Sequence, residues 1–95
     1  MAVVRIPSPL RRYTGGQSKV SVAGATVIEV IDHLDAAYPG LKSRICDESG
    51  QIKRYVNIFI NEDEIRTLQG AETPVGERDE VSIVPAMAGG SDEGR

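Results

Sequence analysis

The sequence predicts an α+β domain in which a mixed sheet of four to five strands packs on one main helix. Two patterns indicate this: a single helical apolar stripe lies before the middle of the chain, and short apolar strand patterns stand on both sides of it. The third observation is the length of 95 residues, which suits one hydrophobic core. Such elements bury their apolar surfaces when the helix covers one face of the sheet.

The N-terminal segment has the pattern of a β-hairpin. The apolar segment 3–6 predicts a short strand, which Pro7 and Pro9 end because proline cannot donate to a ladder. The segment 10–17 predicts a loop, and the alternation at 20–22 predicts a second, half-buried strand. We expect these two strands to pair.

The main helix follows. Thr26 and Glu29 stand at the spacing of a capping box, in which each side chain satisfies a free backbone N–H of the first turn. Apolar residues then recur at three- and four-residue steps, namely Val27, Val30, Ile31, Leu34 and Tyr38. This stripe predicts a helix face turned toward the core, and Pro39-Gly40 ends the helix.

The second half of the chain predicts mainly strands. The segment 41–46 is expected to form a short helical turn, and 47–51 a polar loop. The segment 55–60 (YVNIFI) is rich in β-branched and aromatic residues and predicts a strand. Its alternation separates two faces, with Val56, Ile58 and Ile60 on one and Tyr55, Asn57 and Phe59 on the other.

The last elements complete the expected order. A polar turn at 61–64 precedes a short edge strand at Ile65-Arg66, a loop at 67–78 and a final strand at 81–84. The first and last strands are short of charged residues, as neighbours in the middle of a sheet would be. A hairpin, a helix and then further strands is the order of the β-grasp, or ubiquitin-like, fold.

Composition and charge exclude several classes of protein. The 11 Lys and Arg against 14 Asp and Glu give a net charge of −3, whereas nucleic-acid binders show a basic face. No apolar run approaches the ~20 residues of a membrane span, and Met1–Arg12 lacks a signal-peptide pattern. We therefore expect neither nucleic acid nor a membrane as partner. The single Cys46 excludes an intramolecular disulfide and fits a reducing cytoplasm.

The chain offers little catalytic machinery. One Cys and one His cannot make a structural zinc site of the usual composition, and His33 lies on the flank of the predicted helix, where we expect it to be exposed. A persulfide at Cys46 is one interpretation, but no His or Lys stands beside it to activate the thiol, so we expect a buried or idle group. We therefore expect no enzyme, no metal and no bound cofactor.

The end of the chain is unusual. Pro85 is followed by the small residues AMAGG at 86–90, and glycine has no Cβ, so Gly89-Gly90 is thin and conformationally free. Such a tail could enter a narrow channel and present a carboxylate inside another protein; the other interpretation is a frayed terminus. We divide the chain into a domain at 1–85, a tail at 86–90 and an extension at 91–95.

Three segments carry a resemblance that covers nearly the whole chain: TGGQ at 14–17, RYVNIFIN at 54–61 and DEVSIVPAMAGG at 79–90. The final strand followed by Gly-Gly is the most specific of them. The chain resembles the ubiquitin-like sulfur carriers, which include the molybdopterin synthase small subunit and the thiamine sulfur carrier. It is most similar to the actinobacterial carriers of cysteine biosynthesis.

The resemblance implies a carrier without catalysis of its own. An ATP-dependent activating enzyme would adenylate the Gly90 carboxylate, and a sulfur donor would displace AMP to leave a thiocarboxylate. Ala88 and Gly89 would thread into the enzyme, and the sulfur would pass to a biosynthetic enzyme. The product is left open among cysteine, molybdopterin, thiamine, a thiolated tRNA base and a natural product, with cysteine favoured.

The chain departs from this pattern after Gly90, because Ser91–Arg95 locks the Gly90 carbonyl in a peptide bond. Three explanations stay open: a peptidase trims a precursor, the five residues were added for expression, or this member works without a thiocarboxylate.

The alternation in the segment 55–60 also suggests where partners dock. An outward-facing Phe59 near Val84 and Met87 would form a docking patch, with Arg54 and Arg66 pairing with acids of the activating enzyme. The other interpretation is that Phe59 merely covers the sheet and that both arginines are solvated.

Two other functions stay open. A ubiquitin-like modifier would join Gly90 to lysines of target proteins. A purely structural β-grasp interaction module would not need Gly89-Gly90 at all.

Overall fold

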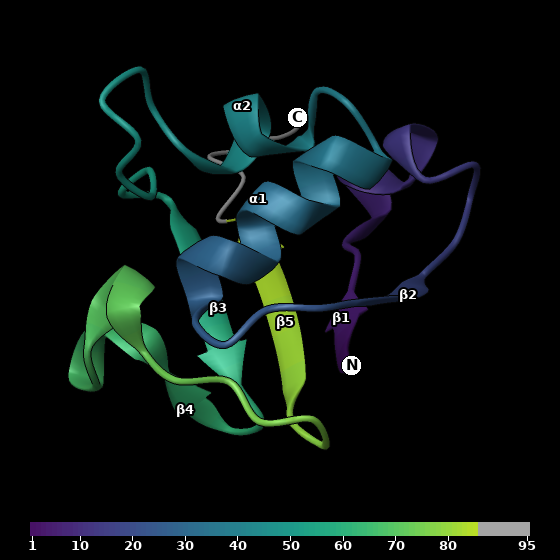
Figure 1. Cartoon of the computed structure of the whole chain (residues 1–95). Helices are drawn as coiled ribbons and strands as arrows, with labels where there is room; N and C mark the ends of the chain where they lie inside the picture. The colour runs from purple at the N-terminus through teal and green to yellow at the C-terminus, as the bar shows by residue number, and fades with distance from the viewer. Residues whose placement is uncertain (86–95) are drawn as a thin grey trace.

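The computed structural model describes residues 1–85, and both the predicted tail at 86–90 and the predicted extension at 91–95 lie outside the described residues. Figure 1 shows a sheet with the longest helix lying across one of its faces. The strands are β1 (Ala2–Arg5), β2 (Lys19–Val22), β3 (Val56–Ile60), β4 (Asp63–Glu64) and β5 (Glu80–Pro85). The helices are α1 (Val27–Ala37) and α2 (Leu41–Ile45), and three short 3₁₀ helices are Ser8–Tyr13, Ile65–Thr67 and Gly70–Glu72.

The last strand lies at the centre of the sheet. The strand order is β2-β1-β5-β3-β4, so the two ends of the domain meet in the middle (Figure 1). β5 pairs in parallel with β1, where Val4 lies opposite Val81, and antiparallel with β3, where Ile58 lies opposite Ile83. The predicted mixed sheet, the predicted β1–β2 hairpin and the central position of the first and last strands are confirmed.

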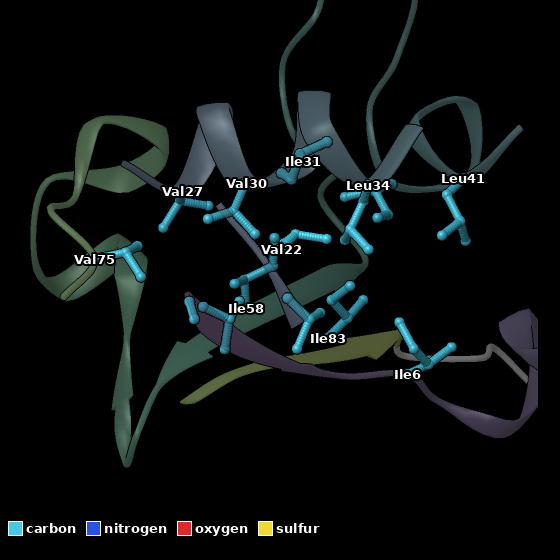
Figure 2. Close-up of a cluster of buried hydrophobic side chains, with 14 of the residues drawn as sticks. Ile6, Val22, Val27, Val30, Ile31, Leu34, Leu41, Ile58, Val75 and Ile83 are labelled. Atoms are coloured by element: carbon cyan, nitrogen blue, oxygen red, sulfur yellow. The ribbon is translucent and has the colours of Figure 1, made fainter. Parts of the chain in front are cut away.

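The core lies between α1 and the inner face of the sheet. Figure 2 shows Val27, Val30 and Leu34 of α1 directed toward Ile58 and Ile83 of the central strands. Val27, Val30 and Leu34 are all 0% exposed, which confirms the predicted apolar stripe. Each such side chain stabilises the fold by about 1.5–3 kcal/mol.

The start of α1 departs slightly from the predicted capping box. The Thr26 hydroxyl accepts from the Glu29 N–H at 3.3 Å, as expected. The Glu29 carboxylate instead accepts from the Ala25 N–H at 3.0 Å, one residue earlier than the standard partner. Both side chains still satisfy backbone donors, so the helix begins where the sequence indicates.

The predicted edge strand at Ile65-Arg66 is wrong. The edge strand is β4, which lies two residues earlier, and Ile65–Thr67 forms a 3₁₀ helix. The Glu64 carboxylate accepts from the Arg66 N–H and caps this turn, while Ile65 is 2% exposed and packs into the core. A side-chain cap and one buried anchor therefore outweigh a weak strand pattern.

Two segments predicted as loops also contain short helices. Ser8–Tyr13 is a 3₁₀ helix that begins directly after Pro7, and Gly70–Glu72 is another. Leu10 is the buried residue of the first of these helices. No helix within residues 1–85 is long and apolar enough to cross a membrane.

Gly24 sets the approach of α1 to the end of β2. Its φ is +150°, and a Cβ built there would lie 2.7 Å from the Val30 side chain and 2.8 Å from the Val30 backbone nitrogen. Contacts this short force the backbone to move. Gly50 also has a positive φ, +88°, but a Cβ there would meet nothing within 4 Å.

We therefore expect Gly24→Ala to lower the free energy of unfolding by about 2–4 kcal/mol, against about 1 kcal/mol for Gly50→Ala. Both substitutions carry the cost of a positive φ, but only the first also meets α1. Urea unfolding followed by circular dichroism gives both values. Equal losses for the two variants would show that the contact with Val30 does not limit this residue.

Candidate functional site

The first part of the candidate site is the end of β5. The ladder to β3 ends where Pro85 lies opposite Val56, and proline suits that position because it has no N–H to donate. β5 has partners on both sides, so the position of Pro85 is fixed by the whole sheet. Gly90 follows Pro85 by five residues, and Ala88, Gly89 and Gly90 lie outside the described residues.

The outer face of the sheet, opposite α1, brings Phe59 and Val84 together. Val84 lies across from Asn57 in the β3–β5 ladder and Phe59 across from Ser82, so Phe59 and Val84 are diagonal neighbours on one face. Val84 is 45% exposed and Phe59 is half-buried. We call this pair the outer patch. Met87, the third residue predicted for it, lies outside the described residues.

Polar side chains surround the outer patch. Glu64 lies opposite Phe59 on β4, and Arg5 lies opposite Ser82 on β1. Arg5 is 3.8 Å from Glu80, an exposed ion pair that contributes little stability. An apolar centre with a polar rim is the usual composition of a docking surface.

Arg66 lies beside the outer patch but already has partners within the chain. Its guanidinium donates to the Asn57 side chain at 2.8 Å and to the backbone oxygens of Val56 at 2.9 Å and Lys53 at 3.0 Å. It also lies 3.6 Å from the Glu64 carboxylate. Arg66 therefore anchors the chain that enters β3.

Arg54 lies in the turn that precedes β3, and its side chain is exposed. Its backbone oxygen accepts a longer bond of 3.4 Å from Arg66. Arg54 thus differs from Arg66, whose guanidinium is already hydrogen-bonded to other residues of the domain.

The two reactive side chains considered in the sequence are not part of this surface. Cys46 is buried, as expected, and burial raises the pKa of its thiol, which disfavours the nucleophilic thiolate. His33 is exposed, as expected, with Nδ1 at 2.6 Å from the Ala23 oxygen. Among the 85 described residues, no group of three or more His, Cys, Asp or Glu is placed to hold a metal ion.

The sequence did not indicate the two hollows that flank Pro85. One, of about 530 Å³, lies toward the outer face and includes Arg5 and Arg11 in its lining. The other, of about 190 Å³, lies toward α2 and includes Arg12, Arg44 and Lys53. These cations come from separate segments, so no spacing in the sequence relates them.

The strand order, with β5 at the centre, and the long helix that crosses one face of the sheet define a β-grasp protein. The sequence profile of the ThiS family matches residues 4–90, and the chain belongs to that family.

Relatives within the family cover most of the chain. It is 44% identical over 89 residues to the sulfur carrier protein CysO of Mycobacterium tuberculosis strain H37Rv, a match that spans 92% of this chain and 96% of that protein. It is 41% identical over 66 residues to small archaeal modifier protein 3 of Haloferax volcanii, which spans 70% and 71%. A chain in the crystal structure of the Amycolatopsis orientalis BexX/CysO complex superposes with a TM-score of 0.89 at 38% identity, over 95% of this chain and all of that one.

We expect Arg66→Lys to lower the free energy of unfolding by about 1–2 kcal/mol, because a single ammonium cannot reach all the oxygens that the guanidinium contacts. Arg54→Lys is the matched control and should change stability by less than about 0.5 kcal/mol. Chemical unfolding of both variants measures the difference. An unchanged Arg66→Lys variant would contradict the anchoring role.

Proposed function

We propose that this chain is a sulfur carrier whose C-terminal Gly90, once exposed, is converted to a thiocarboxylate. The likeness to the sulfur carrier protein CysO over 92% of the chain carries this proposal. The family profile extends to Gly90, in agreement with a working terminus at that residue. We further propose cysteine biosynthesis as the destination and the cytoplasm as the compartment, in keeping with the thiol of Cys46.

The chemistry needs only the terminal carboxylate. Its oxygen attacks the α-phosphorus of ATP, pyrophosphate leaves, and an acyl adenylate forms. A sulfide nucleophile then attacks the acyl carbon, AMP leaves with the bonding electrons, and the C–S bond of the thiocarboxylate remains. ATP belongs to the activating enzyme, so this chain needs no bound cofactor and acts as a substrate rather than as an enzyme.

The fold supports this role by fixing where the tail starts. The five residues after Pro85 span at most about 17 Å when fully extended, so a partner that binds the domain receives Gly90 within a limited radius. Small side chains at Ala88 and Gly89 allow a narrow channel around the tail. The folded domain is therefore the part that a partner recognises, and the narrow tail is the part that carries the reacting carboxylate.

The extension must first be removed. Hydrolysis of the Gly90–Ser91 peptide bond by a peptidase would free the Gly90 carboxylate and release Ser91–Arg95. The activating enzyme, the peptidase and the sulfur-accepting enzyme are then three protein partners of one tail. The solved BexX/CysO complex supports a protein partner for a carrier of this shape.

We propose the outer patch as the docking surface, with Met87 extending it and Arg54 as a charged neighbour. The exposure of Val84 favours this use. Arg66 contributes indirectly, since it holds the segment beneath the patch.

The second candidate function is that of a ubiquitin-like modifier joined to lysines through Gly90. The likeness to small archaeal modifier protein 3 favours it, but that match covers 70% of the chain, against 92% for the sulfur carrier. Both functions need an activated Gly90, and they differ in whether sulfur or a lysine amine displaces AMP.

A chain that ends at Gly90 should gain the mass of one oxygen-to-sulfur exchange when incubated with its activating enzyme, ATP and sulfide. Intact-mass spectrometry measures the change. The full chain should gain nothing until a peptidase removes Ser91–Arg95, because its Gly90 has no free carboxylate.

A chain that ends at Gly89 serves as the control and should react poorly if Gly90 is the acceptor residue. Adducts to lysine that survive reducing gels would favour the modifier instead. Unchanged function after deletion of Gly89-Gly90 would favour a structural interaction module.

Val84→Ser should raise the KM of the activating enzyme for the carrier about three- to tenfold, since it removes an exposed apolar contact and leaves the core intact. Steady-state kinetics on chains ending at Gly90 measure the change, with unfolding curves to confirm that stability is nearly constant. Val3→Ser is the matched control, because Val3 lies on the same face but pairs with Glu80 at the far end of β5. An equal effect of both variants would argue against docking at the outer patch.

A further inference from the structure

The hollow on the α2 side of Pro85, which we call the exit groove, has an apolar floor and a cationic rim. The floor is formed by core residues of four different segments, namely Leu10, Ile45, Val56 and Ile83. Pro9, Tyr55 and Pro85 add apolar walls, and Tyr55 is 53% exposed. A volume of about 190 Å³ suits one large apolar side chain.

Within the described part of the chain, the rim cations of the exit groove have no acidic partners. Arg12, Arg44 and Lys53 form none of the ion pairs found among residues 1–85, and no Asp or Glu lines the groove. Arg11, Lys19, Arg54 and Arg78 also form no ion pair among residues 1–85, but Arg12, Arg44 and Lys53 are distinct in lining one hollow together.

Aromatic rings hold these cations in place instead. The guanidinium carbons of Arg12 and Arg44 lie 5.3 and 5.9 Å from the centre of the Tyr13 ring. Arg44 also donates from Nε to the Tyr13 hydroxyl at 2.7 Å, and this bond lowers the pKa of Tyr13. Lys53 Nζ lies 5.9 Å from the centre of the Tyr55 ring. Ring contacts orient the cations without neutralising them, so their charge stays available to an anion.

We propose that the exit groove binds an acidic segment of a protein partner, in which one large apolar side chain enters the groove and flanking carboxylates meet Arg12, Arg44 and Lys53. The charge complementarity supplies orientation, and the apolar side chain supplies the anchor. The identity of the partner as a protein that receives the tail rests on the proposed function, but the binding itself does not.

The exit groove and the outer patch are separate surfaces. Phe59 and Val84 lie on the outer face of the sheet, whereas the groove is lined by Arg44 and Ile45 of α2 on the other side of Pro85. A partner bound at the groove would hold the domain next to the start of the tail without covering the outer patch. Two partners of the same tail thus have two distinct places to dock.

A synthetic peptide tests the groove without any enzyme. The probe is acetyl-Asp-Glu-Phe-Asp-Glu-amide, titrated into the ¹⁵N-labelled full chain and followed by amide chemical shifts. We expect weak binding whose shifts centre on Arg12, Arg44, Lys53 and Tyr55. Raising the salt from about 50 to about 500 mM should weaken it markedly, since exposed charges are screened.

Variants and matched peptides locate the two parts of the interaction. Lys53→Gln and the double variant Arg44→Gln with Lys53→Gln should weaken binding progressively, the double variant about tenfold, while Arg78→Gln should not. Arg78 precedes β5, at the opposite end of that strand from Pro85. The Arg78→Gln variant therefore removes the same charge at a place away from the exit groove. Peptides with Asn-Gln for Asp-Glu, or Gly for Phe, should each bind more weakly.

Several results would contradict binding of an acidic segment at the exit groove. Shifts centred on Phe59 and Val84, equal binding of the Asn-Gln peptide, or the absence of any saturable shift would overturn the proposal. Displacement of the peptide by inorganic pyrophosphate at a concentration below that of the peptide would overturn the proposal and favour a phosphate ligand. Failure of thiocarboxylate formation would refute the proposed function and leave peptide binding intact, so the two failures are distinguishable.

Discussion

The pairing of β5 with strands on both sides is the constraint on which the rest of the structure depends. Its partner β1 comes from the opposite end of the domain, so the sheet is complete only when the whole domain has folded. Val81 and Ile83 point into the core, while Ser82 and Val84 point outward, and a register slip of one residue would exchange these faces. The core therefore also sets the direction in which the chain leaves Pro85.

This arrangement leaves the outer face free for recognition. α1 packs on the inner face with a buried apolar stripe, and α2 adds the buried side chains of Leu41 and Ile45. The outer face carries Val84 in the open and Phe59 half-covered, held in place by strands whose stability comes from the other side. Under the proposed function, the carrier would present its docking surface without weakening its core, and its reactive group would be the Gly90 carboxylate rather than a side chain.

The sequence predicted those elements whose structure depends on residues close together in the chain. The stripe of α1, the alternation in β3 and the proline that ends β5 follow from periodicity and backbone chemistry, and the structure has them. The edge strand at Ile65-Arg66 was wrong because the Glu64 cap and the buried Ile65 are stronger than a two-residue strand pattern. The internal partners of Arg66 could not be predicted, since they belong to a segment nine to thirteen residues earlier that only the fold places beside it. For the same reason, no pattern in the sequence indicated that Arg12, Arg44 and Lys53 line one groove.

Several cationic side chains lie near the end of β5. Arg5, Arg11, Arg12, Arg44 and Lys53 line the hollows beside Pro85. Glu62, Asp63 and Asp79 lie at the other end, where β3 ends and β5 begins, while Glu80 pairs with Arg5 at 3.8 Å. Hydrogen bonds from the Gly76 N–H and the Asn61 amide lower the pKa of Asp79. The net charge of −3 is therefore not spread evenly, because five cations line the hollows beside Pro85. Cations at this place favour the approach of an acidic partner to the surface beside Pro85, so electrostatic attraction contributes to the rate of encounter, and added salt weakens that contribution.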